Sequence, residues 1–361
     1  MTRLAKLRAA IGERGIDAYL ALTDDVRNSH NVRYLSGFTG TTAHILVTAT
    51  KAYFFCDSRY TAQAKQQAVD FEVLETNYFI KEIEKVVKAE NIKKLAFEEN
   101  ILTWDLFTKY NDQISAKFVP SEGTVEAIRA FKEDDEIEAI QRACVIADKA
   151  YEHILTFVQP GQTEKEVALE LEFFMRRLGA EKLAFDTIVA SGWRSALPHG
   201  VASDKVIEEG DMVTIDFGCF VDGYCSDITR SFGVGKLDCE LVEIYETVQE
   251  AQARVIKEVK PGMTGAEVDA IARDYIESKS FGKYFGHGLG HSIGLEVHED
   301  PRFSPSWPHK IEPGMVITDE PGIYIEGLGG VRIEDDLLIT EDGCFIFNKA
   351  PKELIEIEIK R

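Results

Sequence analysis

An internal repeat in the second half of the chain constrains the fold more than any other feature. Residues 160–163 (PGQT), followed by Glu166, return 101 positions later as 261–264 (PGMT), followed by Glu267. In each copy a threonine stands where it can cap a helix, and the glutamate three residues later completes the pattern of a capping box. Each block also follows a long stretch with helical periodicity. We therefore expect two related α/β halves that face one another, with a ligand site between them.

The repeat continues beyond these blocks. The sequence EGDMV at 209–213 corresponds to EPGMV at 312–316, with one residue of slippage between the two registers. Both segments are predicted to be strands, because each leads into a run of apolar and β-branched residues. Two matched blocks in the same order favour a duplicated unit over a chance match of capping patterns.

The first 130 residues show a different organisation. Short apolar runs at 18–22, 44–48, 52–56, 71–75 and 94–97 alternate with helical patterns at 4–14, 60–68 and 80–90. Such alternation indicates an α/β domain. This part holds 17 basic and 17 acidic residues, so the formal net charge of −21 lies wholly in the remainder. We predict two domains, 1–130 and 131–361, that meet at the charged segment FKEDDE.

Composition excludes several classes of function. A net charge of −21 argues against binding to nucleic acid or to an anionic membrane surface. No apolar run reaches the ~20 residues of a membrane helix, and the first residues lack the apolar core of a signal peptide. The six cysteines form no Cys-x-x-Cys pair, which argues against a zinc ribbon and a redox motif. Without a secretion signal, we expect them to be reduced thiols in a cytoplasmic protein. We expect neither nucleic acid nor a membrane as a partner.

Two acids in the first copy of the repeat are predicted to share one face of a hairpin. The dipeptide Asp222-Gly223 lies between two strand-like runs, which is a strong hairpin signal. If it forms the loop, Gly218 pairs with Asp227, and Asp216 becomes a diagonal neighbour of Asp227 at roughly 7–8 Å. Two buried carboxylates at this distance repel each other unless a cation lies between them. The alternative is that both acids face solvent.

The second half offers a counterpart. Glu320 precedes a glycine-rich turn at 327–330, and Glu334 follows it, so each half supplies two carboxylates from a strand pair. Three neighbouring acids compete for the same role: Asp319, Asp335 and Asp336.

Three of the eight histidines lie between the acidic segments, at His287, His291 and His298. The glycines at 286, 288 and 290 make a continuous helix improbable, which argues against the helical two-histidine site of zinc proteases. Four carboxylates and an imidazole suit a pair of divalent ions such as Mn, Co or Fe, with Zn as a further candidate. Two ions ~3.5–4 Å apart can share a hydroxide nucleophile and polarise a carbonyl group.

On these residues the chain resembles the metallopeptidases of the pita-bread fold, which comprise Xaa-Pro aminopeptidases, prolidases (Xaa-Pro dipeptidases) and methionine aminopeptidases. The matching segments keep the family's order along the chain, at 197–200, 215–218, 226–230, 286–291, 298–299, 320–324 and 330–335. Segments 34–40 and 57–60 resemble the creatinase-type N-terminal domain that the proline peptidases carry. The resemblance implies an α/β (α+β) chain: a creatinase-like domain at 1–130, then a pita-bread domain at 131–361 with an internal pseudo-twofold repeat.

The resemblance also implies a metal centre with two divalent ions, manganese first and Co, Zn or Fe as alternatives. The family's five ligand positions are occupied by Asp216, Asp227, His291, Glu320 and Glu334. In this interpretation a hydroxide that bridges the metals attacks the carbonyl before proline.

Further side chains are expected to assist the reaction. Glu320 would accept the proton of water and pass it to the leaving nitrogen. His298 would donate a hydrogen bond to the oxyanion, while His199 and His287 would contact substrate or help proton transfer. Arg332 should share a strand face with Glu334 and hold the acid cluster, although a purely structural ion pair is the alternative.

The pocket itself is predicted less sharply. Phe185 and Trp193 are candidates either for a wall beside the proline ring or for core packing, and Tyr324 is a candidate contact. Leu289 and Ser292 depart from the residues common in the family, where a small polar residue and a glycine are usual. Both flank His291, and we expect them to alter the pocket wall.

The resulting hypothesis is a metal-dependent Xaa-Pro aminopeptidase that acts on peptides with proline at the second position. A prolidase restricted to Xaa-Pro dipeptides is the main alternative. A metal-free C–N hydrolase of the creatinase type and a non-catalytic module that binds basic proteins are more distant alternatives. An Xaa-Pro bond has no N–H to donate, which gives a reason for a dedicated pocket. The family resemblance also suggests a homodimer in the cytoplasm.

Overall fold

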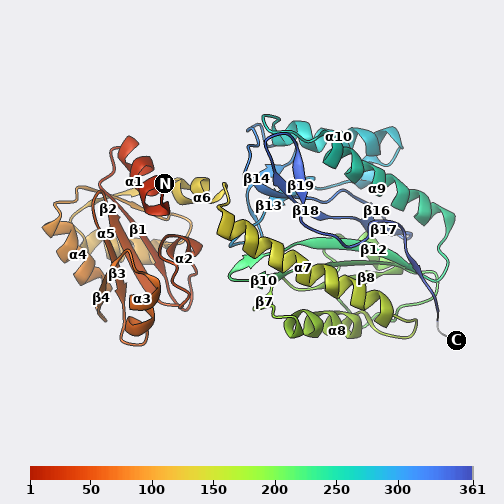
Figure 1. The fold of residues 1–361 in the computed structure, drawn as a ribbon, viewed down its shortest axis with the longest axis horizontal. Helices are drawn as coiled ribbons and strands as arrows, with labels where there is room; N and C mark the ends of the chain where they lie inside the picture. The colour runs from red at the N-terminus through yellow and green to blue at the C-terminus, as the bar shows by residue number, and fades with distance from the viewer. Residues whose placement is uncertain (360–361) are drawn as a thin grey trace. The chain divides into compact units, whose positions relative to one another are not determined.

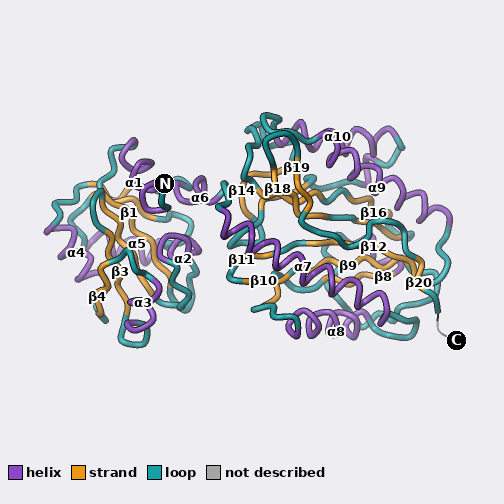
Figure 2. Tube along the Cα trace, viewed as in Figure 1, coloured by secondary structure: helices purple, strands orange, loops and turns teal. Residues whose placement is uncertain are grey.

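The computed structural model describes residues 1–359, which divide into two compact units between Arg129 and Ala130 (Figure 1). Each unit has its own strands and helices (Figure 2). Among the described residues, no helix combines the length and the apolar character needed to cross a membrane.

The first unit is built on one mixed sheet of six strands in the order β4-β3-β2-β1-β5-β6. The strands are β1 (Ala18–Thr23), β2 (Ala43–Thr48), β3 (Ala52–Cys56), β4 (Glu72–Glu75), β5 (Lys94–Phe97) and β6 (Lys117–Pro120). The helices are α1 (Arg3–Glu13), α2 (His30–Ser36), α3 (Thr61–Gln67), α4 (Phe79–Ala89), α5 (Trp104–Gln113) and α6 (Thr124–Arg129). Every residue of the central strand β1 is buried, as its unbroken apolar run predicts. The predicted elements are present, and α5 begins after Thr103, which the sequence marks as a helix cap. The elements α2, α6 and β6 are additions.

Up to residue 359, the second unit contains four long helices: α7 (Asp134–Phe157), α8 (Glu164–Arg177), α9 (Cys239–Glu258) and α10 (Gly265–Ser278). Short 3₁₀ turns lie at η1 (Gly192–Ala196) and η2 (Gly282–Tyr284). In Figure 2 the strands of this unit lie between α8 on one side and α10 on the other. This is the layered arrangement that the repeat predicts.

Each half of this unit contributes one larger sheet and one small one. The first-half strands are β7 (Lys182–Leu183), β8 (Ile188–Ser191), β9 (Met212–Phe217), β10 (Cys219–Val221), β11 (Tyr224–Cys225) and β12 (Ile228–Val234). The second-half strands are β13 (Gly290–Ser292), β14 (Glu299–Phe303), β15 (Val316–Asp319), β16 (Gly322–Ile325), β17 (Gly329–Arg332), β18 (Asp335–Ile339) and β19 (Cys344–Ile346). The larger sheets have the orders β20-β12-β9-β8 and β14-β13-β15-β18-β19, and the final strand β20 (Glu356–Ile357) runs parallel to β12.

The two predicted capping boxes form, which confirms the repeat at its most local level. Thr163 accepts a hydrogen bond from the backbone of Glu166 at 3.2 Å, and the Glu166 carboxylate accepts one in return at 2.6 Å. Thr264 and Glu267 form the same pair at 3.1 and 2.7 Å. Each helix pair thus begins its second helix with the same device, which satisfies two otherwise unpaired N–H groups.

The predicted starts of the strands in each copy are wrong by three or four residues. Gly210 and Gly314 have φ angles of +93° and +90°, so they form a turn that glycine favours and that no regular strand contains. The strands β9 and β15 begin only at Met212 and Val316. The similarity at 209–213 and 312–316 therefore marks a shared turn before each strand.

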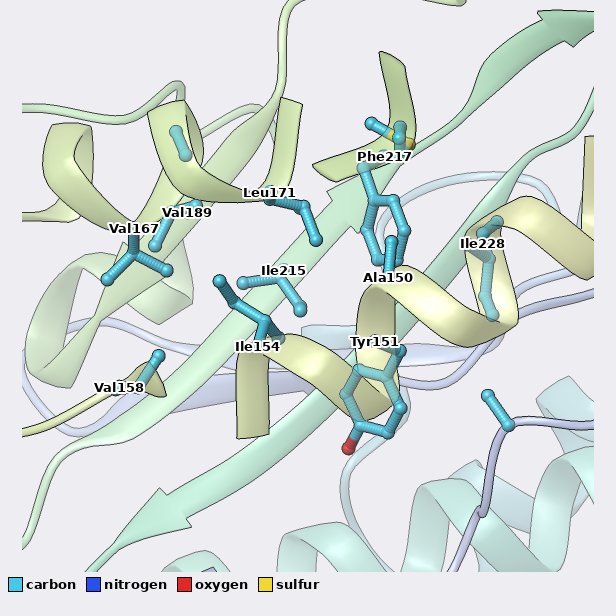
Figure 3. Packing of buried hydrophobic residues seen from close by; sticks show 14 of the residues in the cluster. Ala150, Tyr151, Ile154, Val158, Val167, Leu171, Val189, Ile215, Phe217 and Ile228 are labelled. Carbon is cyan, nitrogen blue, oxygen red and sulfur yellow. The ribbon is translucent and has the colours of Figure 1, made fainter. Parts of the chain in front are cut away.

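Each half of the second unit buries its own apolar core. In the first half, side chains of α7 and α8 meet those of β9, among them Tyr151, Leu171, Ile215 and Phe217 (Figure 3). All four are essentially inaccessible to solvent. The hairpin that carries Asp216 therefore rests on a packed helical layer.

This packing predicts a clear stability difference between two leucines of α8. Leu171 is fully buried, and Leu171→Ala is expected to reduce the free energy of unfolding by about 2–5 kcal/mol because it leaves a cavity. Leu169 lies on the same helix but is 54% exposed, so Leu169→Ala should change it by less than about 0.5 kcal/mol. Urea denaturation followed by circular dichroism measures both, and equal losses would contradict the packing.

Candidate metal centre

A cavity of about 910 Å³ in the second unit is lined by residues of both halves. Every side chain that the sequence singled out for metal binding or catalysis lines this cavity: His199, Asp216, Asp227, His287, His291, His298, Glu320, Arg332 and Glu334. Residues up to 135 positions apart in the chain thus meet in one place.

The hairpin β9–β12 places the first acidic pair. Val221 pairs with Tyr224 across the loop, and Asp216 pairs with Thr229. This is the predicted register, so Asp227 is a diagonal neighbour of Asp216 on one face. Both carboxylates line the cavity, and Asp227 is only 4% exposed, which contradicts the alternative in which both acids face solvent.

The second acidic pair comes from the loops after β15 and β17. Glu320 directly follows β15, and Glu334 lies between β17 and β18. The Glu334 backbone N–H donates to the Thr229 carbonyl at 3.0 Å, and the Thr229 hydroxyl donates to the Glu334 carboxylate at 2.6 Å. Because Thr229 lies two residues after Asp227, these bonds join the two halves at the acid cluster.

His291 reaches the cluster from β13. Gly290 precedes it because any Cβ there would lie 1.9 Å from the Thr318 carbonyl oxygen. The His291 Nδ1 lies 3.3 Å from the Ser292 carbonyl, which can only accept, so this nitrogen carries the proton. The other nitrogen, Nε2, is left with its lone pair, 3.8 Å from an Asp227 oxygen and 3.6 Å from a Glu320 oxygen.

Burial and mutual repulsion shift the protonation of the cluster. Burial, and then the neighbouring carboxylates, raise the pKa of Asp227 and of Glu334 well above their ordinary values. Burial raises the pKa of Glu320 to about 8 and lowers that of His291 to about 3. The imidazole is therefore neutral, as a metal ligand must be.

These residues fit divalent cations. Ligand atoms of Asp227, His291 and Glu334 lie within 4.8 Å of one another. Within residues 1–359, the buried Oδ1 of Asp216 has no hydrogen-bond partner. Buried carboxylates that repel one another and are incompletely paired are costly, and a shared cation compensates them.

A hydrogen-bonded chain runs from the cluster to His287. The Arg332 guanidinium donates to Asp216 at 2.7 Å and to the Tyr324 hydroxyl at 2.8 Å. Tyr324 in turn lies 3.0 Å from His287 Nε2, while His287 Nδ1 donates to the Gly288 carbonyl at 2.8 Å. Burial lowers the pKa of His287 to about 4, so the ring is neutral and Nε2 accepts from Tyr324. Both ring nitrogens of His287 are thus engaged within the chain, which leaves neither of them directed at a substrate.

The other two predicted histidines, His298 and His199, also line the cavity. The ring of His298 lies with its centroid 4.3 Å from that of His291, and burial lowers its pKa. His298 is therefore neutral near pH 7 and can donate one N–H. His199 belongs to the segment after η1 and lines the same cavity.

The competing acids do not line the cavity. Asp335 pairs with Arg230 at 2.7 Å and with Lys352 at 2.6 Å, so its charge is compensated elsewhere. Asp336 accepts a hydrogen bond from the backbone of Asp227, and Asp319 is fully buried. Sequence spacing alone does not exclude these acids as ligands. Neighbouring residues of a strand point to opposite faces, and which face meets the cavity is known only once the register is known.

Two expectations about the wall are wrong. Leu289 is buried in the apolar core of the second half, and Ser292 is fully buried beside Lys132, so neither lines the cavity. Trp193 is 57% exposed and belongs neither to the wall nor to the core, whereas Phe185 does line the cavity.

Several lining residues were missed by the sequence interpretation, among them Lys283, Tyr284 and Arg302. Their only sequence signal is that they lie near the histidine motif. This does not distinguish them from polar residues that face solvent.

Comparison with known proteins follows from this geometry. The model of metallopeptidase family M24 matches residues 138–341, and the creatinase/prolidase N-terminal domain matches residues 3–131. The chain belongs to metallopeptidase family M24. The predicted fold class, a creatinase-type domain followed by a pita-bread domain, is thereby confirmed.

The similar proteins are named either as Xaa-Pro dipeptidases or as X-Pro aminopeptidases. An Xaa-Pro dipeptidase of Pyrococcus furiosus is 42% identical over 98% of this chain and 99% of the relative. The solved Xaa-Pro dipeptidase from Bacillus anthracis is 50% identical with a TM-score of 0.95 over 98% of each chain. The solved X-Pro aminopeptidase from Thermotoga maritima is 43% identical with a TM-score of 0.91, over 96% of this chain and 99% of its own.

The raised pKa values of this M24 site predict how metal and pH act together. A carboxyl group whose folded pKa exceeds its ordinary value binds more protons in the folded state, so stability falls as pH rises through that window. For Glu320 the window runs from 4.5 to about 8. Metal-free protein should therefore lose thermal stability between pH 5 and pH 8, and added Mn²⁺ should raise Tm more at pH 8, where protons compete less.

Thermal unfolding of chelated and Mn²⁺-supplemented protein at both pH values measures this. Glu320→Gln removes one titrating group and should flatten the pH dependence of the metal-free form. An Mn²⁺-induced rise in Tm that is equal at pH 5 and pH 8 would contradict the assignment.

Proposed function

We propose that the chain hydrolyses the peptide bond before proline, in peptides with proline at the second position, with the help of two divalent metal ions. The observation that carries the proposal is the group of four carboxylates around His291, of which Asp227 and Glu334 are buried and Asp216 and Glu320 are half-buried. The four carboxylates and the Arg332 guanidinium together carry a net charge of about −3, which two divalent ions and one hydroxide balance, whereas one ion and a hydroxide would leave about −2 in a largely buried site. The residues that would hold the ions are Asp216, Asp227, His291, Glu320 and Glu334.

When bound, such ions lower the pKa of water and polarise a carbonyl group. The chain's own residues then manage the protons. The nitrogen of proline leaves as a secondary amine and must gain a proton as the bond breaks. Glu320 lies at the cluster with one oxygen 3.4 Å from the Thr318 hydroxyl, and we assign it the transfer of a proton from water to this nitrogen.

Three further groups act on the reacting carbonyl, the acid cluster and the bound peptide. His298 has a neutral ring beside His291 and is assigned the hydrogen bond to the oxyanion, where the loss of one donor typically lowers the rate ~10²–10³-fold. Arg332 holds Asp216 and Tyr324 in place, and His199 contacts the bound peptide from the neighbouring wall.

Part of the cavity suits the proline ring. Phe185, Ile188, Val201 and Val297 contribute apolar lining. A tertiary amide offers no N–H for strand-like pairing, so recognition by shape is the available route. This supports specificity for proline over other residues at the second position.

The length of the substrate is the finer question. Arg302 and Lys283 line the same cavity, and a guanidinium can bind a carboxylate through two parallel hydrogen bonds. Only a dipeptide places a free carboxylate directly on proline. These two cations therefore favour an Xaa-Pro dipeptidase, and the aminopeptidase that the sequence favoured is the second candidate. Manganese as the metal, a homodimer and a cytoplasmic location stay predictions from the family resemblance.

Hydrolysis of Ala-Pro and of Ala-Pro-Ala-Ala, before and after chelation, tests the proposal. We expect chelation to abolish cleavage, and Mn²⁺ to restore it with a preference for the dipeptide. Arg302→Leu should raise KM for Ala-Pro by ~10- to 100-fold, because a hydrogen bond to a charged group contributes roughly 1.5–3 kcal/mol.

Arg254→Leu is the matched control, since Arg254 forms an ion pair with Glu250 on the surface of α9. Faster cleavage of the tetrapeptide would favour the aminopeptidase. Binding of two ions without cleavage of either peptide would refute the substrate assignment. Cleavage by fully chelated protein would refute the requirement for a metal ion.

A further inference from the structure

A β-bulge interrupts the pairing of β13 with β14 directly after His291. His291 pairs with Arg302, but the next residue, Ser292, pairs with Glu299, so two residues of β14 are left over. Bulges of this kind re-aim side chains and are common beside active sites. Here the bulge separates the strand that carries His291 from the segment that carries His298.

A buried lysine lies at this bulge. The ammonium of Lys132 donates to the Ser292 hydroxyl at 3.0 Å and to the Glu299 carboxylate at 3.3 Å. The Lys132 side chain is 1% exposed and that of Glu299 is 7% exposed. The Lys132 backbone N–H also donates to the Gly314 carbonyl at 2.8 Å, which anchors the lysine on the turn before β15. One ammonium thus ties together both strands of the bulge and a third segment.

The two residues that Lys132 holds each directly follow a histidine of the site. The Ser292 carbonyl accepts from His291 Nδ1, and this bond directs Nε2 toward the acid cluster. Glu299 follows His298, whose ring lies against that of His291. A displacement of Ser292 or Glu299 would therefore turn one of the two rings.

We propose that Lys132 is a positioning residue for the metal centre, and that its ammonium fixes the bulge that orients His291 and His298. This inference rests on the proposed function, because His291 is a proposed ligand. Ser292 supplies an acceptor that glycine, the residue common at this position in the family, cannot supply. The departure from the family pattern thus acts behind the site and leaves the cavity wall unchanged.

A purely structural ion pair predicts a different result. If the ion pair were purely structural, replacement of Lys132 would lower the stability of the protein without changing its affinity for the metal. A positioning role predicts a loss of metal affinity in folded protein, since removal of a residue that orients a ligand typically lowers affinity ~10- to 100-fold.

Calorimetric titration of the chelated full chain with Mn²⁺, together with Tm of the metal-free form, separates the two roles. We expect Lys132→Met to weaken Mn²⁺ binding by ~10- to 100-fold and Ser292→Ala to weaken it less, because one acceptor remains. Lys132→Arg should restore part of the affinity. Lys132→Met combined with Glu299→Gln removes both buried charges, so it keeps the fold intact while the weak binding persists.

Lys205→Met is the matched control, because Lys205 forms a partly buried ion pair with Asp211 in the same unit. It should lower Tm and leave Mn²⁺ affinity unchanged. The proposal is overturned if the Lys132 and Ser292 variants bind Mn²⁺ as tightly as the parent protein.

His291→Ala distinguishes this failure from failure of the proposed function. If His291→Ala binds Mn²⁺ as the parent does, the metal centre itself is wrong, and with it the proposed function. If His291→Ala loses Mn²⁺ while the Lys132 variants keep it, only the positioning role fails.

Discussion

Repulsion among four carboxylates that share one largely buried site is the constraint on which the second unit depends. Asp216 and Asp227 come from one half, and Glu320 and Glu334 from the other, so packing of the halves forces like charges together. Arg332 compensates part of this charge, and burial favours the protonated form of the rest. The apolar cores on both sides offset the unfavourable term, since core burial is the dominant favourable contribution to folding.

The groups that orient the cluster lie next to the proposed ligands in sequence. Thr229 is two residues from Asp227, Ser292 directly follows His291, and Arg332 is two residues from Glu334. Side chains two apart on a strand share a face, and backbone groups of the adjacent residue reach the same space. Thr229 binds Glu334 and Arg332 binds Asp216, so each half supplies a partner that holds a carboxylate of the other half, as the outer groups of a metal site do.

The sequence predicted what is local or periodic. The capping boxes, the Asp222-Gly223 hairpin and its register follow from patterns a few residues long, and family motifs supplied the ligand set. Contacts between segments that lie far apart in the sequence could not be predicted. The bond from Lys132 to Ser292 spans 160 positions, and no pattern marks it. The misplaced strand starts have a different cause, because the φ angles of Gly210 and Gly314 depend on a turn that both copies share.

The division of the acids between the halves also sets an order of events during synthesis. Asp227 and Glu334 are 107 residues apart, and a nascent chain emerges from its N-terminus. The first pair of acids therefore leaves the ribosome long before its counterpart exists, and the Thr229–Glu334 bonds form only after a long loop has closed. Formation of the proposed metal centre is thus a late step that requires both halves, and a chain truncated before residue 332 retains the first acid pair without the Arg332 guanidinium that compensates part of its charge.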